Sequence, residues 1–342
     1  MHRGHPIKVV YIGGYSRSGS TLLLQLLSGI PGVTAIGELH DMWRRSVHEN
    51  QLCGCGVPFH DCPFWDAVIR EVFGTGPPGV GHSELERRRV SIQGTGTPRG
   101  WPGLARSISP RLQTPRYLAG RRSYAELLGR LYTMIGRVAD TTTIIDSSKV
   151  PQYAWLLRSS DDLDVHMVHL VRDSRASAHS WRRVKIRPEV HWRTEHMARH
   201  SVVRSAVEWT AFNRLLTRRQ DLYASYTVLR YEELVNDPAA ALREIGCAVG
   251  EQWPVDTALR RAATGGCFAP HTASGNPVRF QTGPLHLRQD DDWRWDMPSH
   301  QQALVTAMTA VGLRRYGYPL RAKPGRAASS AQVVVSGGSE ES

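Results

Sequence analysis

The chain of 342 residues contains very few lysines and no long apolar run. Only four of its 43 basic residues are lysines, which leaves 39 arginines, a bias that we attribute first to genome composition. No apolar stretch approaches the roughly 18 to 20 residues that a membrane span requires, and the first residues do not resemble a secretory signal. We therefore expect a cytoplasmic protein without a membrane span.

Cysteine is also scarce, with five residues in the whole chain. An odd number fits poorly with a complete disulfide framework. Three of the five cluster in CGCGVPFHDCPFW, at Cys53, Cys55 and Cys62. His60 could complete a zinc site, but the spacing matches no established zinc pattern. We therefore favour a packed, reduced loop and predict no metal site.

The formal net charge of +12 raises the question of a nucleic-acid partner. The basic residues are scattered, with modest clusters at 87–89 and 182–187 and no basic module interleaved with aromatic residues. An anionic small ligand explains the charge at least as well. We predict no nucleic-acid partner and keep a non-catalytic module that binds anions or nucleic acid as an alternative. The oligomeric state stays open.

Strand-like and helix-like segments alternate along the chain. This alternation predicts an α/β fold in which parallel strands form a doubly wound sheet flanked by helices, with ligands bound at the carboxyl edge of the sheet. We expect a single domain over residues 1–321. The expected strands are 8–14, 141–146, 164–173 and 226–231, and the expected helices are 20–29, 153–160, 174–185, 197–220 and one that begins near 237–238.

Two stretches stand apart from this pattern. Residues 74–122 are rich in Gly, Pro, Arg and Ser and are too long for an ordinary connection. We predict that they form a lid, a substrate-cap insertion or a partly disordered segment. Residues 322–342 lack the apolar content to pack, so we expect a flexible tail.

The stretch GGYSRSGSTLL, residues 13–23, has the outline of a phosphate-binding loop. Gly14, four residues, Gly19, Ser20 and Thr21 fit that pattern, but a serine stands where a nucleoside triphosphate site needs lysine. Backbone N–H groups and the start of the next helix would still hold an anion, and Arg17 offers a cation from within the loop. The missing lysine counts against a P-loop-type kinase or ATPase, which is the nearest alternative enzyme.

A second anion-binding pattern lies in VHLVRDSRASAHSW. Arg172 follows a strand, and Ser180 lies eight residues later on the expected helix, so that both side chains could face one phosphate. The alternative is that Arg172 pairs with Asp173 or Asp146. For Arg175 a phosphate contact and a solvent-facing position are equally open.

These two motifs, in this order, resemble those of sulfotransferases that use 3′-phosphoadenosine 5′-phosphosulfate (PAPS) and have a P-loop-like fold. The resemblance implies that Arg172 and Ser180 hold the 3′-phosphate. It further implies that the 5′-phosphosulfate is held by Arg17, Ser18, Gly19, Ser20 and Thr21.

Two later segments extend the resemblance. VLRYEELVNDPAAAL is similar to the family segment that places a tyrosine ring beside the adenine, which here is Tyr231. HTASGNPVRFQTGPLHLRQDDDW resembles the late loop that closes over the nucleotide in bacterial members, and Arg279 is the best candidate there for a phosphate contact.

The resemblance also implies catalytic residues. Glu38, in AIGELHDMW, matches the glutamate base of tyrosylprotein and several bacterial sulfotransferases, and His40 is the alternative base. Cytosolic members use a histidine after Lys-Thr, where this chain reads SSKVP. Lys149 in that segment resembles the lysine that stabilises charge on the transferring group, together with Arg17. The chemistry requires PAPS and no metal cofactor.

The acceptor is not specified by any motif. We expect a hydroxyl of a small molecule or glycan, which covers carbohydrates, lipids and small natural products. Residues 74–122 and the region around 187–200 are the predicted acceptor pocket.

Overall fold

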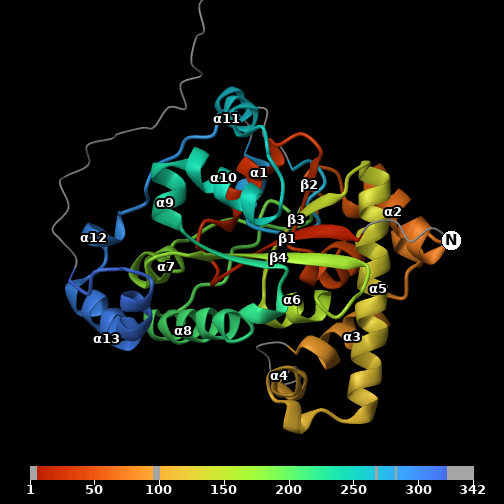
Figure 1. Cartoon of the computed structure of the whole chain (residues 1–342), viewed down its shortest axis with the longest axis horizontal. Helices are drawn as coiled ribbons and strands as arrows, with labels where there is room; N and C mark the ends of the chain where they lie inside the picture. Colours follow the sequence, from red (N-terminus) through yellow and green to blue (C-terminus); the bar gives the residue numbers. More distant parts are fainter. Residues whose placement is uncertain (1–5, 95–100, 266–268, 282, 322–342) are drawn as a thin grey trace, which may run out of the picture.

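The computed structural model describes residues 6–94, 101–265, 269–281 and 283–321. Its centre is a single parallel sheet of five strands in the order β2-β3-β1-β4-β5 (Figure 1). This arrangement confirms the predicted doubly wound α/β sheet. The strands are β1 (Ile7–Gly13), β2 (Val33–Gly37), β3 (Thr143–Lys149), β4 (Leu163–Val171) and β5 (Ser225–Arg230).

The central strand β1 is buried on both of its faces. Val9 and Tyr11 belong to one apolar cluster, whereas Val10 and Ile12 belong to another. Successive side chains of a strand point to opposite faces, so each cluster fills one side of the sheet. A strand covered on both sides reads as a continuous apolar run, which is why KVVYI was recognisable as a strand.

Helices cover both faces of the sheet (Figure 1). One face packs on α1 (Ser20–Ser28), α9 (Tyr231–Asn236), α10 (Pro238–Ala248) and α11 (Val255–Thr264). The other face packs on α2 (Pro63–Phe73), α5 (Pro115–Ala139), α6 (Pro151–Leu157) and the end of α8 (Val202–Arg218). Of the helices that the structure describes, none is both long and apolar enough to cross a bilayer.

Helices α7 (Ser174–Ser180) and α8 are shorter than the sequence pattern predicted, because α7 ends at Ser180 and α8 begins at Val202. The residues between them pair across a loop. The amide of Met197 donates to the Lys185 carbonyl at 2.8 Å, and Ile186 forms an isolated bridge with His196. This cross-loop pairing satisfies backbone groups that a longer helix would have used.

The segment 74–122 contains α3 (His82–Gln93), α4 (Trp101–Ile108) and the first turns of α5. Helix α3 contacts α5 and α6, and α4 contacts α6, so the segment lies along the side of the sheet that α5 and α6 cover (Figure 1). Its role as a cap stays a prediction. Residues 95–100 and the expected tail at 322–342 lie outside the described residues.

Helices α12 (Trp293–Asp296) and α13 (Ser299–Arg315) complete the described chain. Both contact α7, and α13 also contacts α8. They therefore pack against α7, the helix that follows β4.

Candidate active site

One cavity of about 270 Å³ lies at the carboxyl edge of the sheet. Each strand delivers one lining residue at or just beyond its end, because the carboxyl ends of parallel strands meet at the same edge. These residues are Arg17 after β1, Glu38 after β2, Lys149 at the end of β3, Arg172 after β4 and Tyr231 after β5.

Most of the residues predicted from the sequence line this cavity. Besides the five named above, Gly19, Ser20, Thr21 and Ser180 line it. Ser18 and Arg279 are exceptions. The Ser18 side chain is 2% exposed and is turned into the protein, near Gly14. Arg279 lies behind the cavity wall.

Two positions of the loop require glycine, because neighbouring atoms come too close to leave room for a side chain. A Cβ on Gly14, which has φ +146°, would lie 2.3 Å from the Leu170 carbonyl oxygen. A Cβ on Gly19, which has φ +94°, would lie 2.5 Å from the Tyr231 ring. Helix α1 then begins at Ser20 without a side-chain cap. Its first N–H groups have no partner within the helix and are available to an anion.

The Arg17 guanidinium is buried with few partners. The residue has left-handed backbone geometry, with φ +74°, and its guanidinium stacks 4.7 Å from the Trp181 ring centroid. Nη2 donates to the Met197 thioether at 3.3 Å, whereas Nε and Nη1 are buried without a partner in the described chain. Burial lowers the pKa of Arg17, while the Glu38 carboxylate acts in the opposite direction. An arginine remains cationic at neutral pH under such a shift.

Arg172 joins the two predicted anion-binding segments. Its Nη1 donates to the Arg17 carbonyl at 3.2 Å, and its Nη2 donates to the Asp290 carbonyl at 2.8 Å and lies 3.1 Å from the Asp290 carboxylate. The guanidinium stacks 4.5 Å from the Tyr231 ring centroid. Its Nε is buried and finds no acceptor among the residues described.

The acids that the sequence offered as partners of Arg172 are occupied elsewhere. Asp173 accepts from Arg175, with 2.7 Å between Oδ2 and Nη2. Asp146 accepts from the Ser148 amide at 2.6 Å and from the Tyr132 hydroxyl. Neither carboxylate therefore competes with a ligand for Arg172.

Arg175 contacts neither the cavity nor solvent, so both positions left open for it were wrong. It is 1% exposed, and besides its pair with Asp173 it donates to the carbonyls of Pro319 at 2.8 Å and Leu320 at 3.2 Å. Its guanidinium stacks 4.6 Å from the Trp293 ring centroid. Arg175 ties α7 to the end of the described chain.

Glu38 and Lys149 form an ion pair across β2 and β3. Lys149 Nζ donates to Glu38 Oε1 at 2.5 Å and to the Ser147 carbonyl at 3.0 Å. Lys149 has φ +69°, an unusual conformation for a residue other than glycine, and such strained positions concentrate at functional sites. The late loop fixes Glu38, because its amide donates to the Ser274 carbonyl at 2.8 Å and its carbonyl accepts from the Ser274 hydroxyl at 2.7 Å.

The charges around Glu38 keep it ionised. Burial alone would raise the pKa of Glu38, but the cationic side chains of Lys149 and Arg45 bring that pKa below its ordinary value. Arg279 adds to this field from behind the cavity wall: a Cβ on Gly275 would lie 3.8 Å from Arg279 Nη1 and 3.9 Å from Glu38 Cγ. Burial lowers the pKa of Arg279 to about 10, so it remains cationic at neutral pH.

His40, the alternative base, does not line the cavity. Its amide donates to the Ser148 hydroxyl at 3.1 Å, and its ring lies 6.3 Å from that of Tyr153. Burial lowers the pKa of His40 to about 4. The side chain that faces the cavity is therefore that of Glu38.

Several lining residues were missed by the sequence analysis. Two of them had a signal in the sequence, since Lys185 is one of only four lysines and Asp290 begins a run of three aspartates. The cavity carries five cationic side chains and two carboxylates. The missed residues include Arg45, Trp181, Lys185, Met197 and Asp290. Met197 falls in the region predicted for the acceptor, whereas no described residue of 74–122 lines this cavity.

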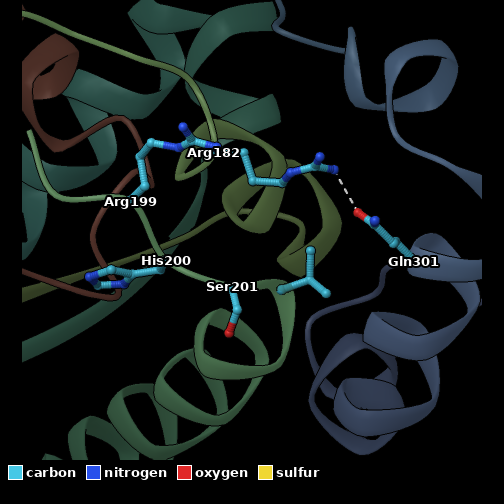
Figure 2. Close-up of a pocket in the computed structure, with 6 residues that line it drawn as sticks. Arg182, Arg199, His200, Ser201 and Gln301 are labelled. Atoms are coloured by element: carbon cyan, nitrogen blue, oxygen red, sulfur yellow. Dashed lines mark hydrogen bonds between the residues drawn. The ribbon is translucent and has the colours of Figure 1, made fainter.

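A second hollow of about 550 Å³ lies beyond Trp181. In Figure 2, Arg182 reaches across to Gln301 of α13, and the His200 ring points away from that pair. The Arg182–Gln301 hydrogen bond measures 2.6 Å, and His200 stacks on Trp181 at 3.8 Å. This hollow holds none of the residues predicted for a nucleotide, so we place the candidate active site in the first cavity.

The fold and the loop after β1 define a P-loop-like α/β protein. No protein-family model and no curated protein matches the chain. Among solved structures, the sulfotransferase domain of the Synechococcus PCC 7002 olefin synthase is 19% identical, with 94% of this chain and 98% of that chain covered at a TM-score of 0.53. The chain therefore shares the fold of that domain.

Two further solved structures resemble the chain less closely. The sulfotransferase domain from the curacin biosynthetic pathway is 16% identical, with 93% of this chain and 100% of that chain covered at a TM-score of 0.49. The sulfotransferase STF9 from Mycobacterium avium is 14% identical, with coverages of 93% and 79% and a TM-score of 0.47.

Proposed function

We propose that this protein is a sulfotransferase that moves the sulfuryl group of PAPS to a hydroxyl of a small-molecule or glycan acceptor. The observation that carries the proposal is the set of buried guanidinium N–H groups at the cavity, on Arg17 and Arg172, that have no partner in the described chain. A buried charged donor without an acceptor is costly, and an anionic ligand would satisfy it.

The residues present fit the two anionic ends of the donor. The loop with Arg17, Ser20 and Thr21 and the uncapped start of α1 would hold the 5′-phosphosulfate. Arg172 and Ser180 would hold the 3′-phosphate. Arginine suits both ends because its planar guanidinium can donate two hydrogen bonds to one phosphate or sulfate group.

The Tyr231 ring would lie beside the adenine. In the structure this ring packs against Gly19 and against the Arg172 guanidinium. The Arg279 side chain is held behind the cavity wall by a 3.0 Å hydrogen bond from its Nη2 to the Leu52 carbonyl. Its Nε and Nη1 are buried without a partner in the described chain. We therefore assign Arg279 to the electrostatic support of Glu38 and keep the phosphate contact expected from the sequence as a prediction.

Glu38 is the proposed general base. When bound, PAPS supplies a sulfuryl group that is already activated as a mixed anhydride, so that no metal is required for its transfer. Glu38 would accept the proton of the acceptor hydroxyl at Oε2, which accepts no hydrogen bond from the described residues, while Oε1 is held by Lys149. Its lowered pKa ensures the unprotonated form at neutral pH.

Lys149 and Arg17 are the proposed electrostatic catalysts. Lys149 bonds to Glu38 directly, and Arg17 lines the same cavity as both of them. Cations fixed at this position would stabilise the negative charge that develops during transfer. An ammonium group is compact and mobile, and it can leave Glu38 Oε1 as that charge develops.

The direct test uses PAPS with a radiolabelled sulfate and a panel of carbohydrate, lipid and phenolic hydroxyl acceptors, followed by mass spectrometry of the products. We expect label transfer that does not require Mg²⁺. Mg²⁺-dependent hydrolysis of ATP, without sulfate transfer to any acceptor, would instead favour a P-loop-type ATPase or kinase.

The 3′-phosphate assignment is tested by binding. Calorimetric titration compares adenosine 3′,5′-bisphosphate with 5′-AMP. We expect the unaltered protein to prefer the bisphosphate and Arg172→Ala to lose that preference by roughly ten- to hundredfold, the range of a charge-assisted hydrogen bond. Arg182→Ala, which alters the second hollow, is the matched control and should keep the preference. An unchanged preference in Arg172→Ala would remove the assignment.

A further inference from the structure

The cysteine cluster is a site that the proposed function does not use. The structure brings the thiols of Cys53, Cys55 and Cys62 together with the imidazole of His271, and their four ligand atoms lie within 4.8 Å of one another. Cys53 and Cys62 are buried, His271 is half-buried and Cys55 is exposed. We propose that these four residues bind one structural Zn²⁺ ion.

Two of the distances between the ligand atoms match a tetrahedral zinc site, and the others are no longer than 4.8 Å. Zinc bonds of about 2.3 Å to sulfur and about 2.0 Å to nitrogen put neighbouring sulfurs about 3.8 Å apart and a sulfur about 3.5 Å from the nitrogen. The Sγ atoms of Cys55 and Cys62 are 3.7 Å apart, and Cys62 Sγ is 3.4 Å from His271 Nδ1. Only small shifts of the side chains are needed to accept the ion.

The backbone around the cluster is built to hold this geometry. The Gly56 amide donates to the Cys53 carbonyl at 2.9 Å, and the Cys53 amide donates to the Val57 carbonyl at 2.8 Å, which closes a tight turn around Cys55. A Cβ on Gly54 would lie 2.3 Å from Thr272 Oγ1 and 2.8 Å from the Ala269 carbonyl. Only glycine therefore lets the turn approach the segment that carries His271.

The His271 ring is also fixed in orientation. It stacks on Phe64 with 4.7 Å between ring centroids and 8° between planes, and the Trp65 indole donates to the His271 carbonyl at 2.9 Å. Contacts of this kind around a ligand orient it and strengthen metal binding. Both aromatic residues lie in the first turn of α2, directly after Cys62.

The structure chooses a different fourth ligand from the one considered from the sequence. His60 turns away, because its Nε2 contacts the Val47 carbonyl at 2.9 Å. His271 comes from a segment about 200 residues later and replaces it. Three thiolates and one imidazole form a Cys₃His set, which is typical of closed structural zinc sites and leaves no open position for catalysis. This proposal revises the expectation that the chain has no metal.

The ion would join the cysteine loop to a segment that forms one wall of the candidate active site. The His271 segment continues into Ser274, which fixes Glu38, and into Gly275, Asn276 and Val278, which line the cavity. Zinc would thus anchor this wall without taking part in the reaction. The proposal does not depend on the proposed function, since metal content is measured without any enzymatic assay.

The test is zinc content, measured by mass spectrometry of the full chain purified under reducing conditions. We expect about one zinc per chain in the unaltered protein and a loss of most of it in Cys55→Ser and His271→Gln. Cys55 is exposed, so that its serine variant leaves the core intact. Cys247→Ser, which replaces another exposed cysteine outside the cluster, is the matched control and should retain the zinc.

Two further measurements make each outcome decisive. Substitution with Co²⁺ should give the visible absorption of tetrahedral thiolate coordination in the unaltered protein but not in His271→Gln. A zinc chelator should lower the Tm of the unaltered protein and leave that of His271→Gln unchanged. Equal zinc content in all variants, no uptake of Zn²⁺ by the reduced protein, or a disulfide between Cys55 and Cys62 in place of the metal would overturn the proposal.

Discussion

The cavity and the packed region behind α7 each hold an arginine stacked on a tryptophan, and the two arginines differ in their hydrogen bonds. Arg17 lies 4.7 Å from the Trp181 ring, and Arg175 lies 4.6 Å from the Trp293 ring. Arg175 donates to a carboxylate and to two backbone carbonyls. Arg17 leaves Nε and Nη1 without any acceptor that the described residues provide.

This difference separates a structural arginine from a ligand-binding one. Arg175 is 1% exposed and Arg17 is half-buried, but Nε and Nη1 of Arg17 are themselves buried, so the hydrogen bonds of these donors are what distinguishes the two arginines. An arginine whose donors are satisfied by the chain stabilises the fold, whereas one whose donors are unsatisfied is costly until a ligand supplies the acceptor. The two regions should therefore respond in opposite ways to substitution, and four predictions test this contrast.

The largest expected effect concerns a carboxylate of the cavity. Glu38→Gln removes the proposed base and should lower kcat by roughly 10²- to 10⁴-fold while leaving the affinity for adenosine 3′,5′-bisphosphate nearly unchanged. The matched control in the packed region is Glu232→Gln, because Glu232 accepts from the Tyr318 hydroxyl at 2.6 Å and has no contact with the cavity. Near-normal turnover in Glu38→Gln, together with a loss in His40→Gln, would move the base to His40.

The next effect is on stability. Arg175→Met breaks a buried ion pair and leaves Asp173 without its charge partner, so the free energy of unfolding should fall by about 3 to 5 kcal/mol. Chemical denaturation measures this change. At a temperature where the variant remains folded, its affinity for adenosine 3′,5′-bisphosphate should match that of the unaltered protein. A stable variant with lost binding would erase the contrast between the regions.

The converse substitution is Arg17→Met. It should weaken nucleotide binding by roughly ten- to hundredfold, since charge-assisted hydrogen bonds to the ligand are lost. Stability should change little, because only the weak Nη2 bond to the Met197 thioether is lost, whereas Nε and Nη1 have no acceptor in the described chain. Calorimetric titration and denaturation of one sample give both values. A loss of stability comparable to that of Arg175→Met would show that Arg17 serves the fold.

The smallest effect is a shift in pH dependence. Lys149 helps to hold the pKa of Glu38 below its ordinary value against the opposing effect of burial. The acidic limb of the pH profile of kcat/KM should therefore have an apparent pKa below the ordinary pKa of a glutamate side chain. In Lys149→Ala the effect of burial remains without this counterion, so the pKa of Glu38 should rise and the acidic limb should move to higher pH. An unmoved limb would mean that another group titrates.

The fold was predictable because its signal is local. KVVYI and DVHMVHLV are apolar runs that a parallel sheet buries on both faces, and Asp237 with Pro238 marks the start of α10 through a hydrogen bond from the Ala240 amide to the Asp237 side chain. The ends of α7 and α8 were not predictable in this way. Pairing between Ile186 and His196 is a non-local contact that overrides helix propensity.

The candidate site was predictable to the extent that its residues follow strands. Glu38, Lys149, Arg172 and Tyr231 were found because the carboxyl edge of a parallel sheet collects the residues after each strand. The Arg279 side chain does not line the cavity, although Gly275, Asn276 and Val278 of the same loop do, and a late loop has no strand from which such a difference could be predicted. Its phosphate contact stays a prediction. Ser18 follows the left-handed Arg17 and its side chain is turned inward, so its contact with the 5′-phosphosulfate stays a prediction.

The sequence by itself determined the order of the strands and helices, the two glycines of the loop and which polar residues follow the strands, because these depend on side-chain size, backbone freedom and neighbouring residues. Tertiary structure alone decided that the guanidinium donors of Arg175 bond within the chain and that two donors of Arg17 find no acceptor there. It also brought His271 to three distant cysteines. Those outcomes depend on the acceptors and donors that come within about 3 to 4 Å, and contacts at that range between remote segments exist only after the chain has packed.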